Sequence, residues 1–211
     1  QTDCPMAVSP KRVDAAQYLI DTHQCNVIIS DDGLQHYALA RDIEIAVIDG
    51  SRLFGNRYCL PAGPLREPIV RLRHVDFIIF NGNNSNADYV MQLNPGPVIN
   101  VADNRVQRTL TDFADQMVHS IAGIGHPERF FNYLTDAGLT ITPHHFADHY
   151  RFRAIDLHFN DTNPILMTEK DAIKCRTFAT DNMWYIPVKA SINNNLADHI
   201  LSKLAGIHHH G

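Results

Sequence analysis

Two adjacent aspartates, Asp31 and Asp32, stand just after the short apolar run at residues 27–29, and Gly33 follows them. In open α/β sheets, ligands bind at the carboxyl ends of strands, and carboxylates placed there can hold Mg²⁺ together with nucleotide phosphates. Aspartate also caps the helix or turn that follows a strand. The spacing alone therefore leaves both a metal site and a cap open.

More polar side chains lie close to this pair along the chain. Gln35 and His36 follow Gly33 and can present polar groups to the same place, or they begin a helix with a solvated face. Asp49, followed by a glycine, repeats the acid-glycine pattern at the end of the next apolar run. It either joins the same site or only ends its strand.

A stiff loop, "LPAGPLREP" at residues 60–68, displays Arg66 and Glu67. Prolines restrict the loop before it binds anything, so less entropy is lost on binding. The guanidinium fork of arginine suits phosphate oxygens, and a glutamate can accept sugar hydroxyls or orient a cation. The structural alternative is a turn with a surface ion pair.

Three further motifs occur in the second half of the chain. "AGIGHPERFF" at 122–131 is typical of a tight turn between a strand and a helix, whose start can also bind anions. "HHFADHYRF" at 144–152 contains the neighbours Asp148 and His149, a pair able to support acid–base chemistry. "MTEKDAIKC" at 167–175 indicates a strand followed by a capped helix.

Hydrophobic periodicity predicts alternating strands and helices, which is typical of an α/β fold with a mainly parallel sheet. The expected helices lie at 13–23, 127–137, 169–175 and 196–204, with a weak one at 155–159. The expected strands lie at 27–29, 43–48, 77–80, 89–93, 98–101, 118–122, 139–142, 165–168 and 184–188. Residues 50–68 form an unusually long loop, which indicates a functional role.

Composition narrows the class of protein. The net charge of −5 and the lack of a basic block disfavour a nucleic-acid surface. No run of 18 apolar residues occurs, so we expect no membrane span. The four scattered cysteines favour a reducing compartment over a disulfide framework. We expect the chain to begin in mid-fold and to end in an affinity-tag remnant at 207–211.

The sequence contains no GxxxxGK[ST], GxSxG or HExxH motif. Four stretches nevertheless resemble, in order and spacing, the tetraacyldisaccharide 4'-kinase family of Gram-negative bacteria. They are "SDDGLQHYALARDIEIAVIDG", "R-LFGNRYCLPAGPLREP", "AGIGHPERFF" and "MTEKDAIKC", and "HFADHYRF" lies between the last two. The resemblance extends over about residues 5–204, and ordered motifs of this length are specific.

The resemblance implies a P-loop kinase that uses ATP and Mg²⁺ to phosphorylate the 4'-hydroxyl of a tetraacylated glucosamine disaccharide 1-phosphate, in lipid A biosynthesis. It implies a peripheral enzyme at the cytoplasmic face of the inner membrane, whose partners are ATP, the acylated lipid substrate and the membrane surface, and no nucleic acid. The family's Walker A loop, its membrane-associated helix and one catalytic aspartate precede the region present here. We therefore expect an inactive fragment, the C-terminal two-thirds of such an enzyme.

Residue by residue, the resemblance implies that Asp31 and Asp32 are Walker B-like acids at Mg²⁺, Asp32 also serving catalysis. Gln35 and His36 complete that motif at the substrate or phosphate.

The same resemblance places Arg66 at phosphate or substrate and Glu67 among the catalytic residues. His149 matches the histidine of a catalytic dyad. The family often has a second histidine where this chain has Tyr150, which puts the dyad position in doubt; the register favours His149.

The expected organisation is the remainder of a P-loop kinase core at 1–107, a linker at 108–117, a smaller α/β domain at 118–206 and the tag remnant. Two alternatives remain open. One is a glycosyltransferase-like α/β protein in which Asp31 and Asp32 hold a metal and a nucleotide sugar. The other is a binding fragment without catalysis.

Overall fold

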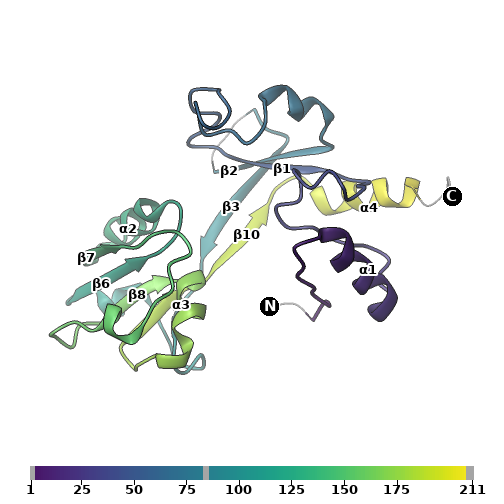
Figure 1. The fold of residues 1–211 in the computed structure, drawn as a ribbon. Coiled ribbons are helices and arrows are strands. Elements are labelled where there is room, and N and C mark those ends of the chain that lie inside the picture. Colours follow the sequence, from purple (N-terminus) through teal and green to yellow (C-terminus); the bar gives the residue numbers. More distant parts are fainter. Residues whose placement is uncertain (1–2, 83–85, 208–211) are drawn as a thin grey trace. The chain divides into compact units, whose positions relative to one another are not determined.

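A computed structural model describes residues 3–82 and 86–207 (Figure 1). Residues 208–211 of the expected tag remnant lie outside this part. The chain divides into two compact units. The first unit comprises Gln1–Gln92 and Ile192–Gly211, and the second unit comprises Leu93–Ser191. The strands β3 (Tyr89–Pro95) and β10 (Val188–Ile192) each cross the boundary between the units.

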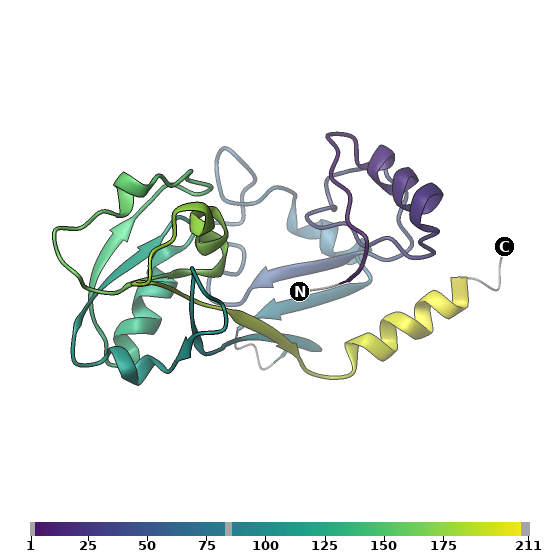
Figure 2. The same cartoon turned by 90° about the horizontal axis from the view of Figure 1, so that it is seen from below.

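The first unit contains parallel strands whose carboxyl ends meet. Its sheet has the order β1-β2-β3-β10, in which β1 pairs with β2 and β2 with β3 in parallel. Asp49 of β1 is the register partner of Asn81 of β2, and Figure 2 shows the two strands side by side. The remaining elements are α1 (Arg12–His23), β1 (Ile45–Asp49), η1 (Ile69–His74), β2 (Phe77–Asn81) and α4 (Leu196–Ile207).

The core of the first unit is small. Leu196 of α4 packs with Phe77 and Ile79 of β2, and Ile200 lies against the same cluster. The spacing of Leu196 and Ile200 places both on one face of α4. The expected closing helix at 196–204 therefore forms because it covers this sheet.

The second unit has a six-stranded sheet in the order β5-β4-β9-β8-β6-β7. The pairs among β6, β7, β8 and β9 are parallel, whereas β4 pairs with β5 and β9 in antiparallel fashion. Its elements are β4 (Val98–Asn100), β5 (Gln107–Arg108), η2 (Leu110–Phe113), β6 (Met117–Ala122), α2 (Pro127–Asp136), β7 (Thr140–His145), η3 (Ala154–Leu157), β8 (Ile165–Thr168), α3 (Glu169–Cys175), η4 (Arg176–Phe178) and β9 (Met183–Ile186).

Apolar residues fill both faces of this second sheet. Ile165 and Met167 of β8 pack in one cluster with Cys175 of α3. Leu166, between them, packs in the other cluster with Leu134 of α2. A central parallel strand buried on both sides needs a continuous apolar run, and the stretch at 165–167 provides it.

The predicted α/β class with a mainly parallel sheet is confirmed, but the strand predicted at 27–29 is wrong. Residues 27–29 adopt no strand, and Ile29 is 93% exposed. Within the described part of the chain, no strand pairs with this run. An apolar run forms a strand only when a neighbouring strand pairs with its backbone hydrogen-bonding groups. The periodicity of the run does not show whether such a neighbouring strand exists.

The compact units also divide the chain elsewhere than at the expected linker. Phe113, inside the expected linker at 108–117, is fully buried and contacts Trp184 edge to face at 5.5 Å. The helix α4 lies in the first unit. In the described residues, no helix is both long and apolar enough to cross a bilayer.

Candidate functional site

Two loops distant in sequence meet in the first unit through the side chains of Asp32 and Arg66. Arg66 Nη1 donates to both carboxylate oxygens of Asp32, at 2.6 and 2.8 Å. The hydrogen bond and the charge of Arg66 hold the pKa of Asp32 below its ordinary value. Both side chains are more than half exposed, so the pair is weak as a source of stability and open to exchange with other ions.

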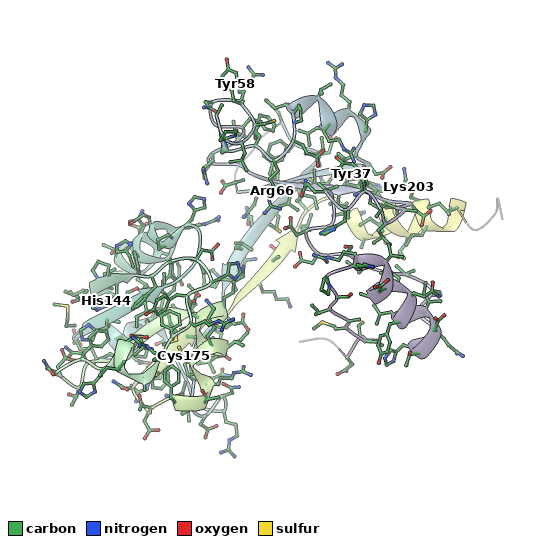
Figure 3. The ribbon with its side chains drawn as sticks, in the orientation of Figure 1. Tyr37, Tyr58, Arg66, His144, Cys175 and Lys203 are labelled. Carbon is green, nitrogen blue, oxygen red and sulfur yellow. The ribbon has the colours of Figure 1, made fainter. Side chains whose placement is uncertain are left out.

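Glu67 forms a second bridge between the same loops. Its Oε1 accepts from Gln35 Nε2 at 2.7 Å, and its Oε2 accepts from the Tyr37 hydroxyl at 2.6 Å. The Tyr37 hydrogen bond is the main cause that lowers the pKa of Glu67, followed by Gln35 and the positive charge of Arg71. Figure 3 labels Tyr37 and Arg66, one from each loop. Glu67 is thus held in a fixed, ionised position.

An ion-pair network supports both bridges. Arg71 Nη2 donates to the two carboxylate oxygens of Glu44 at 2.6 and 2.7 Å, and Arg71 Nε lies 3.4 Å from Glu67. Glu44 also pairs with Arg41 at 3.0 Å. Arg41 Nη1 in turn donates to the carbonyls of Gly33 and Leu34 at 2.9 and 2.8 Å. The backbone directly after the aspartates is therefore tied to the Glu67 loop.

The remaining predicted residues of the first unit lie beside these bridges. Asp31 and His36 are exposed, and His36 donates its backbone N–H to the Gly33 carbonyl at 3.0 Å. Asp49 Oδ1 accepts from the backbone N–H and the hydroxyl of Ser51, as a residue that ends a strand and begins a turn does. Asp49 also lines a cavity that Gln35, Glu67 and Arg71 line.

The carboxylates of Asp31 and Asp32 can supply some, but not all, of the ligands that a Mg²⁺ ion needs. Within residues 3–82 and 86–207, no cluster of three or more His, Cys, Asp or Glu side chains is arranged to hold a metal. Mg²⁺ commonly takes one or two carboxylates and completes its shell with water and substrate phosphates. Two adjacent carboxylates without a third ligand match that pattern, and they suit a metal that arrives with a nucleotide.

A cavity of about 230 Å³ lies beside the bridges in the first unit. Its walls are mostly apolar residues of β1, η1 and the loop before η1, and Gln35, Glu67 and Arg71 also line it. The cavity therefore has both apolar and charged walls.

His149 lies in the second unit, on a turn after β7. Its backbone φ is +59°, and its side chain is 92% exposed. Asp148 lies beside it, with Oδ2 3.8 Å from His149 Nε2 and Oδ1 accepting the backbone N–H of His149 at 3.0 Å. An exposed imidazole beside a carboxylate is able to take part in general acid–base chemistry.

The structure brings together Asp32, Gln35, Arg66 and Glu67, all of which were predicted from the sequence. It adds Tyr37, Arg41 and Glu44, which the sequence analysis did not single out, and Arg71, which is expected only as a possible anion-binding arginine near Arg66. One signal was available for Arg71: it follows Glu67 by four residues, a spacing that places side chains on one face of a helical turn. The roles of Tyr37 and Arg41 depend on contacts across loops and had no such signal.

Comparison with known proteins places the chain in a family. The family model described as Tetraacyldisaccharide-1-P 4'-kinase matches residues 1–205. A curated relative from Nitrosococcus oceani, named Tetraacyldisaccharide 4'-kinase, is 50% identical over 204 residues, which cover 97% of this chain and 60% of the relative. A relative of the same name from Hahella chejuensis is 46% identical over 212 residues, covering 100% of this chain and 62% of the relative.

The fold is also that of a solved member. A crystal structure titled as the "apo" form of LpxK from Aquifex aeolicus in complex with ATP is similar with a TM-score of 0.71. It is 22% identical, and the match covers 95% of this chain and 63% of that one. The chain thus spans about 60% of the length of its curated relatives. On the match of the family model over residues 1–205, the chain belongs to the tetraacyldisaccharide-1-phosphate 4'-kinase family.

Proposed function

We propose that the complete protein containing these residues transfers the γ-phosphate of ATP to the 4'-hydroxyl of a tetraacylated glucosamine disaccharide 1-phosphate. Family membership and the shared name of the relatives support this activity. The observation that carries it is the meeting of two family-like stretches at the Asp32–Arg66 and Gln35–Glu67 contacts. An acidic pair beside an arginine provides both signs of charge that a metal–nucleotide complex requires.

In this proposal Asp31 and Asp32 would hold Mg²⁺, and the ion would supply positive charge that stabilises the phosphoryl transfer. Arg66 leaves the carboxylate of Asp32 and donates to phosphate oxygens, an exchange that its exposure permits. Gln35 and His36 present polar groups to phosphate or substrate. Glu67 acts by fixing Gln35 and the loop of Arg66 in place.

His149 is proposed as the proton-handling group of the second unit. Its imidazole orients or deprotonates the sugar hydroxyl, and the Asp148 carboxylate lies 3.8 Å from its Nε2. The exposed position of His149 leaves both ring nitrogens accessible to a substrate. Tyr150, at the position where the family often has a second histidine, is proposed not to take this role.

The family's setting extends the proposal to location. We propose a peripheral enzyme of lipid A biosynthesis at the cytoplasmic face of the inner membrane, with the membrane surface and the acylated disaccharide as partners. Because the 211-residue sequence contains no Walker A motif, we expect no turnover from this chain by itself.

The test is a phosphoryl-transfer assay with ATP and tetraacyldisaccharide 1-phosphate, using the complete kinase that contains these residues. Asp32→Asn should lower kcat at least about 100-fold, because one preorganised charge is lost from the transition state. Asp103→Asn is the matched control, since Asp103 also forms an exposed pair with an arginine, Arg105 at 3.0 Å, but lies in the second unit.

Full activity of Asp32→Asn would show that the pair is only a structural cap. A parallel reaction with nucleotide sugars separates the kinase from the glycosyltransferase alternative. Glycosyl transfer in place of phosphoryl transfer would reject the proposed function.

A further inference from the structure

Two motifs that the proposed function does not use meet in the second unit. One is the glycine turn after β6, beginning at Gly123, and the other is the first turn of α3, which contains Asp171. The side chain of Asp171 is fully buried, with 0% exposure. Burying a carboxylate is unfavourable unless hydrogen bonds and an opposite charge compensate it. Helix capping alone therefore does not explain why an acidic side chain is buried at this position.

Both oxygens of the Asp171 carboxylate accept hydrogen bonds. Oδ2 accepts from the Gly123 N–H at 2.9 Å and from the Thr168 hydroxyl at 2.7 Å, and Oδ1 accepts from Lys174 Nζ at 2.8 Å. Thr168 already caps α3 by accepting from the Asp171 N–H. The bond to Gly123 is different in kind, because it joins α3 to a loop 48 residues earlier in the chain.

Gly123 is also the point where a third segment makes contact. A β-carbon built on Gly123 would lie 3.2 Å from Asp171 Oδ1, 3.3 Å from the Ala147 carbonyl oxygen and 3.3 Å from Phe152 Cζ. These distances are shorter than ordinary van der Waals contact. Only a residue without a side chain fits between α3 and the segment at 146–152 without displacing one of them.

That third segment carries His149. Its base is fixed by the Phe146 N–H, which donates to the Ala122 carbonyl at 3.0 Å, and its turn closes when the Tyr150 N–H donates to the Ala147 carbonyl at 3.0 Å. The rings of Phe146, Tyr150 and Phe152 pack with centroids 4.9–5.2 Å apart. His149 is exposed on a turn whose base is rigidly packed.

Lys174 completes the connection. Its ammonium group pairs with Asp171 and lies 5.6 Å from the centroid of the Phe152 ring. In Figure 3, Cys175 marks the end of the short helix α3 that supplies both charged residues. A cation over an aromatic face is attractive, so α3 contacts the segment at 146–152 both through Gly123 and through Phe152.

We propose that Asp171 is a positioning residue for His149: by holding Gly123 from within the core, it fixes the turn at 147–150 that presents the imidazole. The inference rests on the proposed proton-handling role of His149. It predicts that a change at Asp171 acts on the reaction through His149 and not through the binding of either substrate. Displacements of about 1 Å at a reacting group can lower rates up to about 100-fold.

The test is a double-mutant cycle in the complete kinase, with kcat and KM measured for ATP and for the disaccharide lipid. Asp171→Asn should lower kcat about 10-fold or more while both KM values stay within about 2-fold. In a His149→Ala background the same substitution should have no further effect on kcat, because the group that it positions is absent.

Asp112→Asn is the matched control. Asp112 also occupies the third position of a helical first turn capped by a threonine, Thr109. Its carboxylate accepts from the Thr109 N–H at 2.8 Å, but unlike Asp171 it is exposed. This substitution should leave kcat unchanged in both backgrounds.

Equal losses from Asp171→Asn in the two backgrounds would overturn the positioning role while leaving the proposed function intact. Unchanged kcat for His149→Ala alone would instead reject the proposed role of His149, and the inference with it. If Asp171→Asn does not fold, Gly123→Ala replaces it in the cycle, since it retains the buried carboxylate and displaces the turn. A folded Gly123→Ala enzyme with full kcat would also overturn the inference.

Discussion

The two units hold the loops that carry the candidate site residues in different ways. In the first unit, the loops of Asp32 and Glu67 are joined by ion pairs and hydrogen bonds among side chains that water still reaches, such as Arg66. In the second unit, the loop of His149 contains packed aromatic rings, and the neighbouring Gly123 is held by a carboxylate with no exposure. Accessible charges can exchange partners with ions and phosphates, whereas a buried carboxylate can only support a fixed geometry.

The difference extends to the cores. Both faces of the sheet in the second unit carry large apolar clusters, whereas the corresponding cluster in the first unit has three buried members. We infer that packing dominates the stability of the second unit, and that polar contacts contribute a larger share in the first. The following predictions test this contrast.

The largest loss of stability should come from a variant that creates a cavity in the second unit. Leu134→Ala removes a fully buried side chain and should lower the free energy of unfolding by about 2–5 kcal/mol. Urea unfolding followed by the fluorescence of Trp184, the single tryptophan of the chain and a member of the same cluster, measures it. Ile173→Ala, at a side chain 58% exposed on α3, should change it by less than about 0.5 kcal/mol. Similar values for the two variants would contradict the inference that packing dominates the stability of the second unit.

A smaller effect should come from the ion-pair network of the first unit. Glu44→Gln weakens its pairs with Arg41 and Arg71 and should cost about 1–2 kcal/mol locally. Amide hydrogen exchange should show faster exchange at His36 and Leu39, whose N–H groups close the loop after the aspartates. Amides of β8, in the second unit, serve as the internal control. Faster exchange there would mean that the effect of the substitution is not confined to the first unit.

The two units should also respond to acid at different pH values. Burial lowers the pKa of His144 below its ordinary value of 6.5, and the charges of His119 and His145 add to that effect. A lowered pKa means that the unfolded state binds the proton more readily, so this contribution is present above pH 6.5 and is lost as the pH falls below it. In the first unit, the pKa of Glu67 lies below 4.5, so its contribution is lost only as the pH falls below that value.

Hydrogen exchange as a function of pH measures both transitions. His144→Gln should remove the higher one, and Glu67→Gln should remove the lower one. The same pH response in both units of the unmodified protein would contradict the assignment. The control variant is His158→Gln, because His158 is not one of the two histidines, His119 and His145, whose charges lower the pKa of His144.

The smallest effect on stability should come from the Asp32–Arg66 pair. Arg66→Ala removes an ion pair whose partners are both more than half exposed, so the free energy of unfolding should change by less than about 0.5 kcal/mol. Thermal unfolding with and without 0.5 M salt measures it. A larger loss would show that the pair is structural, and would weaken its proposed exchange to phosphate.

Most of the expected helices and strands formed in both units, including the helix at 13–23 and the strand at 77–80 of the first unit. In the second unit, the strand at 165–168 and the helices at 127–137 and 169–175 formed close to where they were expected, because their apolar pattern matches the faces that they bury. In the first unit, the run at 27–29 has the same pattern but no strand beside it. Its conformation depends on a partner that local sequence does not encode.

The sequence by itself determined the fold class, the family and the positions of the acidic pair, the Arg-Glu loop and the histidine turn, because each depends on residues close together in the chain. Only the tertiary structure decided that Arg66 pairs with Asp32, that Tyr37 and Gln35 share Glu67, and that Asp171 holds Gly123. These contacts join residues 30–48 positions apart. Their partners are fixed by how strands and loops pack, which no local pattern of charge or hydrophobicity specifies.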